Sequence, residues 1–177
     1  MDEIHKLAGR NAAYLEQGID LIERVGDPLF CGSPEAGTRG VGPHFRHIVD
    51  HYDSFFRGLG DGRVDYDQRE RDTRLETDRA AIRSKLGELC ARLDGLRSEE
   101  VLDSISVVMD CGHTEGDDRT WTGSTVLREL QFLVSHTVHH YAMIGEILGA
   151  EGVEMDPDFG VAPSTLRYEN RKRLCAP

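Results

Sequence analysis

Residues 124–148, STVLRELQFLVSHTVHHYAMIGEIL, decide the fold class of this chain. Apolar side chains and two histidines recur there at spacings of three and four, which is the period of one face of an α-helix. Ser124 suits the N-cap position, and Gly149 suits the position just past the helix end. The segment therefore predicts a long helix that buries a single stripe. That stripe consists of Val126, Leu130, Leu133, His136, His140, Ile144 and Ile147.

Three earlier segments show the same periodicity, so four helices are expected in all. The first ends near Gly26, and the second covers residues 43–57, with Pro43 at its first position. The third follows a capping-box pair formed by Thr73 and Glu76. Four amphipathic helices of this kind predict an all-α fold, a four-helix bundle. The three stripes are Ile4, Ala8, Ala12, Leu15, Ile19 and Ile22; His44, His47, Ile48, His51 and Phe55; and Ile82, Leu86, Leu89, Leu93 and Leu96.

The connections between these helices are mostly polar, with one exception before the last helix. Residues 105–109, ISVVM, are β-branched enough for a strand, and residues 119–122 can return as a second one. We therefore expect a short β-hairpin between the third and fourth helices. Residues 61–72 are expected to form a loop, and the chain after Gly149 an irregular tail with a final helical turn. The length of 177 residues suits one domain, residues 1–177.

Composition excludes some classes of function. The formal charge of −11 argues against nucleic acid as a partner, because phosphate binding requires a basic patch. A basic cluster at residues 167–173 is short and is interpreted as a solvated helix end. The chain has no signal-peptide pattern in residues 1–10 and no apolar run long enough for a membrane span. A cytoplasmic protein is expected, with four widely spaced cysteines that stay reduced.

Six of the eight histidines lie in two short windows, one on each of two predicted helices. His136 and His140 are four residues apart, so both imidazoles lie on one helix face, one turn apart. Such a pair can reach one ion at about 2.0–2.1 Å, with a third ligand from a facing helix. The alternative is a pair of buried hydrogen-bonding residues. Burying two unpaired imidazoles costs free energy, however, and a metal ion would satisfy them. The histidines in the two windows are His44, His47 and His51, and His136, His139 and His140.

The remaining candidate residues have ordinary interpretations. His5 and His113 lie outside both windows and are expected to be surface or loop residues. Asp50 and Glu129 lie on the two helices that carry the histidines, but each is expected to form a surface salt bridge. No general base is evident from the sequence.

Two segments, GPHFRHIVDHY at residues 42–52 and FLVSHTVHHY at residues 132–141, resemble the DinB/YfiT-like superfamily of metal-binding four-helix bundles. The resemblance implies one divalent ion, zinc or nickel, held by His47, His136 and His140. Whether His44 or His51 replaces His47 as a ligand, or joins it, is left open. Many relatives have Arg and Gly after the last ligand, where this chain has Tyr141 and Ala142, so the subfamily is left open.

Two classes of function are compatible with this resemblance. In the first, the protein is an enzyme that transfers a low-molecular-weight thiol, or hydrolyses or isomerises a small substrate. Three histidines leave an open metal position where a thiol or water would lose its proton more easily. In the second, the bundle is a non-catalytic metal-binding module for a ligand or partner. A small-molecule substrate, no membrane and no nucleic acid are expected; the oligomeric state is left open, with a homodimer as one expectation.

Overall fold

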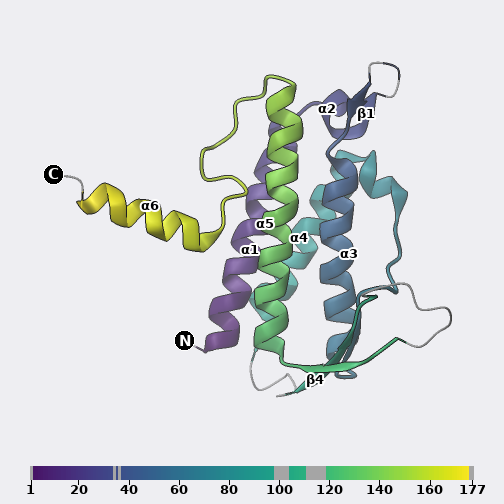
Figure 1. Ribbon diagram of the computed structural model, residues 1–177. Coiled ribbons are helices and arrows are strands. Elements are labelled where there is room, and N and C mark those ends of the chain that lie inside the picture. Colours follow the sequence, from purple (N-terminus) through teal and green to yellow (C-terminus); the bar gives the residue numbers. More distant parts are fainter. Residues whose placement is uncertain (1, 34, 36, 98–103, 111–118, 176–177) are drawn as a thin grey trace.

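The computed structural model describes residues 2–33, 35, 37–97, 104–110 and 119–175 (Figure 1). Four long helices lie side by side in it, and α1 and α3 each pack against both α4 and α5. The expectation of a mainly helical fold is therefore confirmed for this part of the chain, although a small sheet accompanies the helices. The long helices are α1 (Glu3–Arg24), α3 (Gly42–Leu59), α4 (Arg79–Gly95) and α5 (Val126–Ala150).

The predicted apolar stripes supply the core between these helices. Each stripe contributes side chains with almost no exposed surface, because the helical period places them on one face. The largest fully buried side chains are Tyr52, Tyr141, Phe30, Phe45, Phe55, Leu15, Leu21, Ile22, Ile48, Ile82, Leu86 and Leu89.

A polar network is buried in this core and links three of the helices. Asn11 of α1 donates through Nδ2 to the carbonyl oxygens of Leu7 and Leu130, and the Tyr52 hydroxyl donates to Asn11 Oδ1 at 2.7 Å. The Tyr52 and Thr137 hydroxyls lie 3.3 Å apart. Because every buried polar group in this network has a partner, it sets the relative position of α1, α3 and α5.

The predicted β-hairpin is present, although its second strand starts at Thr122 instead of Arg119, and a third strand extends it. β4 (Ile105–Val108) pairs antiparallel with β5 (Thr122–Ser124), and β3 (Arg63–Asp65) pairs in parallel with β4. The prediction of a loop for residues 61–72 is therefore wrong over β3. Val64 is fully buried, and its strand pairs with a segment about forty residues away, which local polarity does not reveal. Gly58 permits this arrangement, because a Cβ there would collide with the Arg63 backbone.

Two predicted helix starts are displaced, by one residue at α5 and by several residues at α4. Ser124 lies in β5, and Thr125 caps α5 by accepting from the backbone N–H of Arg128. The pair Thr73 and Glu76 bounds a separate 3-10 helix, η1 (Thr73–Glu76), while α4 starts after its own cap, Asp78. In both cases a neighbouring Thr or Asp is better placed to accept a hydrogen bond from the free N–H groups of the first helical turn.

The other connections contain more structure than expected. Residues 27–42 include α2 (Asp27–Cys31) and the antiparallel pair of β1 (Gly32–Ser33) and β2 (Thr38–Arg39). The tail ends in α6 (Pro163–Cys175), which is longer than one turn and projects from the four long helices (Figure 1). Among the described residues, no helix combines the length and the apolar character that crossing a bilayer requires.

Candidate metal centre

The structure brings together the three histidines that the resemblance implies as ligands. His47 comes from α3, and His136 and His140 come from successive turns of α5. One ring nitrogen from each residue lies within 4.8 Å of the other two. The ring centroids of His136 and His140 are 4.6 Å apart, and that of His47 is 5.0 Å and 4.6 Å from them. Three potential ligand atoms therefore converge on one point between the two helices.

This geometry suits a tetrahedral ion. Zinc–nitrogen bonds of about 2.1 Å place the nitrogens of a tetrahedral site about 3.4 Å apart. The described nitrogens lie within 4.8 Å of one another, so modest ring rotations would bring all three to bonding distance. The residues present therefore fit a divalent metal ion that prefers imidazole ligands.

The three imidazoles are also in the protonation state that metal binding requires. Burial, followed by the neighbouring histidines, lowers the pKa of His47 to about 3 and that of His136 to about 2. Burial and the neighbouring His44 lower the pKa of His140 to about 4. All three rings are therefore neutral near pH 7, and each has one nitrogen lone pair for a ligand bond. Arg69 Nη1 lies 3.2 Å from Nδ1 of His47 and must give up that contact when His47 binds an ion.

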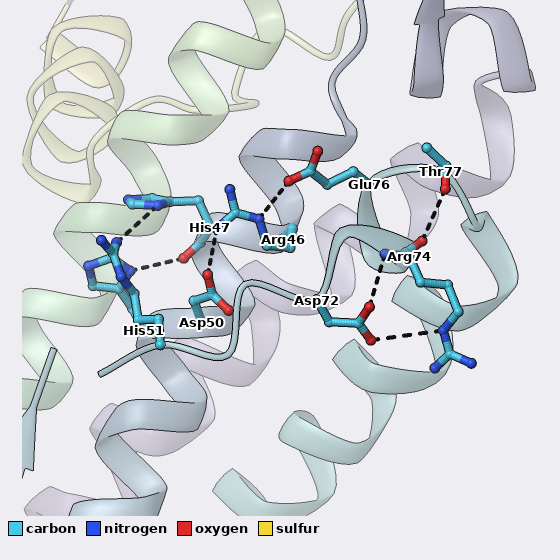
Figure 2. Close-up of polar contacts among 9 residues, drawn as sticks. Arg46, His47, Asp50, His51, Asp72, Arg74, Glu76 and Thr77 are labelled. Carbon is cyan, nitrogen blue, oxygen red and sulfur yellow. Dashed lines mark hydrogen bonds and ion pairs between the residues drawn. The ribbon is translucent and has the colours of Figure 1, made fainter. Parts of the chain in front are cut away.

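His44 and His51 flank the triad instead of belonging to it. The Nδ1 atoms of His44 and His140 are 3.1 Å apart, which makes His44 a hydrogen-bond partner of a proposed ligand. His51 is buried, its ring centroid is 3.8 Å from that of His136, and its Nδ1 donates to the His47 carbonyl oxygen at 2.9 Å (Figure 2). Both rings can hold the triad residues in position.

Of the three remaining histidines, the two that the structure describes lie outside this group. His139 is exposed, and its ring meets that of His140 edge-on with a centroid distance of 5.3 Å. His5 is half-buried at the other end of the sequence and lies near Arg97. His113 falls outside the described residues.

Asp50 and Glu129 are expected to form surface salt bridges. Each does form an ion pair, Glu129 with Arg128 at 3.1 Å, but both are buried, so the expected surface location is wrong. Asp50 pairs with Arg46 at 2.6 Å, and Arg46 also binds Glu76 at 2.9 Å, which ties η1 to α3 beside His47 (Figure 2). Glu129 accepts from the Tyr66 hydroxyl at 2.8 Å and from the Ser124 hydroxyl. Arg46, one turn earlier on α3, compensates the burial of the Asp50 carboxylate, and the Tyr66 and Ser124 hydroxyls compensate that of Glu129.

An open cavity of about 850 Å³ adjoins the histidines. His47, His51 and His136 form part of its wall, so one side of the triad is accessible from it. No sequence pattern selects the remaining wall residues, because most lie in segments that were interpreted only as polar connections. They are Tyr66, Asp67, Arg69, Arg71, Met109, Asp110, Arg119 and Phe132.

Comparison with known proteins leaves the family open. No family model matches the chain, and no solved structure matches it. The chain is similar to FK506-binding protein 5 of Rhizopus delemar, with 30% identity over 105 residues, or 59% of this chain. The match spans 27% of that relative's length. The site must therefore be interpreted from its own geometry.

Proposed function

We propose that the protein is a metal-dependent enzyme of the DinB/YfiT-like type that transfers a small thiol to an electrophile. The observation that supports this proposal is the convergence of three neutral imidazoles, from His47, His136 and His140, beside an open cavity. Closed structural sites use four protein ligands, whereas catalytic sites use three and keep one position for a substrate. Zinc and nickel are the metals that suit this donor set.

In this proposal a bound ion supplies Lewis acidity, which lowers the pKa of a coordinated thiol or water. The chain's own part is to hold three ligands in a fixed arrangement and to admit the second reactant through the cavity. In thiol transfer the sulfur loses its proton to solvent and forms a bond to carbon as the leaving group departs. Hydrolysis or isomerisation at the same position is the related chemistry.

The finer features of fold and setting belong to the same proposal. The mutual packing of α1, α3, α4 and α5 supports a four-helix bundle of this type. Cys31 and Cys90 are free thiols, which supports a reducing compartment, the cytoplasm. The homodimer stays a prediction to be measured in solution.

Metal analysis followed by a thiol-transfer assay tests this proposal. The purified protein is expected to contain about one equivalent of zinc or nickel, and the chelator-treated protein should regain it in titration. The loaded protein should then accelerate the reaction of a low-molecular-weight thiol with 1-chloro-2,4-dinitrobenzene, and the metal-free protein should not. Stoichiometric metal without turnover of any thiol or ester would favour the non-catalytic module. Failure to bind either metal would refute the proposal.

A further inference from the structure

We propose that Arg69 forms an anion subsite in the cavity beside the histidines and receives the carboxylate of a small organic substrate. The inference rests on the proposed function for the reaction at the triad. The carboxylate contact itself depends only on the cavity and its side chains. The proposed contact therefore identifies the substrate class as a small organic carboxylate, which the triad alone leaves open.

Arg69 lines this cavity and has hydrogen-bonding capacity that the described part of the chain leaves unused. Its Nη1 lies 3.2 Å from Nδ1 of His47, which places the guanidinium beside the triad. Its Nε is buried and has no hydrogen-bond partner in the described part of the chain. A guanidinium stays protonated and has only donors, so a buried N–H without an acceptor is costly. An anionic acceptor in the cavity would remove this cost.

In the part of the chain that the structure describes, Arg69 also has no direct ion-pair partner, although the carboxylates of Asp50 and Asp67 act on its charge from a greater distance. Among the described residues Arg69 forms no ion pair, whereas Arg119, on the same cavity wall, pairs with Asp65 at 2.8 Å. Arg71 lines the cavity too and adds a second positive charge close to Arg69. In a chain of net charge −11, an unpaired cation in a cavity is a specific attraction for an anion.

The rest of the wall favours an organic anion over a bare inorganic one. Phe132 and Tyr66 pack edge-to-face, with ring centroids 5.2 Å apart, and both face the cavity. They offer apolar surface for the body of a ligand, while the planar guanidinium matches a carboxylate with two parallel hydrogen bonds. A volume of about 850 Å³ is ample for a small molecule. The arrangement fits an aryl or alkyl carboxylate.

Calorimetric titration of the chelator-treated, metal-free protein with phenylacetate and its neutral isostere phenylacetamide tests the subsite. The wild-type protein should bind the acid about tenfold more tightly than the amide, because charge-assisted hydrogen bonds are lost with the charge. Arg69→Gln should abolish this preference, and Arg69→Lys should restore part of it. Arg74→Gln is the matched control, since Arg74 is an exposed arginine that pairs with Asp72 outside this cavity, and it should bind like the wild type.

Equal binding of acid and amide by the wild type, or no binding of either, would overturn the inference, as would an unchanged preference in Arg69→Gln. If that variant does not fold, the Nε resonance of Arg69 in the wild type provides the measurement, and it should shift with phenylacetate but not with phenylacetamide. A resonance that does not move contradicts the subsite. Zinc titration of the same samples separates the two proposals, because loss of zinc binding bears on the triad, and loss of acid preference on Arg69.

Discussion

The Nδ1 atoms of His44 and His140 lie 3.1 Å apart, between α3 and α5. One ring must donate and the other accept across this contact, which leaves Nε2 of His140 as its free nitrogen. A histidine ligand whose second nitrogen has a fixed partner is held in one tautomer and one orientation. His44 is therefore a positioning residue for the proposed metal centre.

Replacing His44 with alanine should weaken zinc binding by about 10–100-fold, because His140 loses the partner that orients its ring. Competition with a chromophoric zinc chelator measures the affinity. His44→Asn keeps a short polar side chain and should recover part of it, while His5→Ala, at a histidine remote in sequence, should have no effect. An unchanged affinity in His44→Ala would show that the contact does not orient His140.

Removal of His140 and removal of its neighbour His139 should have opposite outcomes. His140→Ala is expected to lose most of the bound metal, because the two remaining imidazoles must compete with water for the ion. His139→Ala should keep it, since His139 is exposed and outside the converging group. Elemental analysis of both variants after identical purification provides the comparison. Retention of metal by His140→Ala with loss from His139→Ala would reverse the ligand assignment.

The metal-free protein should lose stability as the pH falls from about 6.5 toward 4. In the unfolded chain these histidines have a pKa near 6.5, and in the folded protein burial lowers the pKa of His47 and His136 to about 3 and 2. The unfolded state then binds more protons in this window, so acid favours unfolding. The upper limit is about 1.4 kcal/mol per pH unit for each histidine, which partial exposure reduces.

Urea unfolding at several pH values, followed by circular dichroism, measures this slope. His136→Phe removes one contributing group and should make the dependence on pH shallower. Stability that is constant between pH 6.5 and 5 would contradict the lowered pKa values. Zinc should restore stability at neutral pH and do so less well in acid, because protons compete for the same nitrogens.

Asn11→Ala should destabilise the fold by about 2–4 kcal/mol. The substitution removes the acceptor of the Tyr52 hydroxyl and leaves space at a position with no exposed surface. The free energy of unfolding in urea measures the loss. Lys6→Ala, at an exposed site on the same helix, should change it by less than about 0.5 kcal/mol. Equal effects of the two substitutions would mean that the network contributes little.

Local patterns predicted the helices well because helical periodicity depends on neighbours three and four residues apart. The stripe through Leu130, Leu133 and Ile144 is part of the core in the structure, and so is that through Leu86 and Leu89. β3 was not predicted, because its pairing partner lies far along the chain and because three residues are too few to show the alternation of apolar and polar side chains that marks a strand. The burial of Glu129 was missed for the same reason, since its partner Tyr66 comes from another part of the chain. That of Asp50 was missed because burial depends on how α3 packs, although its partner Arg46 lies one turn away on the same helix.

The sequence by itself determined that His136 and His140 share a helix face, because residues four positions apart lie on the same face of any α-helix. The family resemblance added His47 and left His44 and His51 open. Only the tertiary structure decided that His47 converges with the pair and that the other two flank it. It also placed Arg69 beside His47. The rotation of one helix against another depends on the packing of the whole core, which no local pattern in the sequence contains.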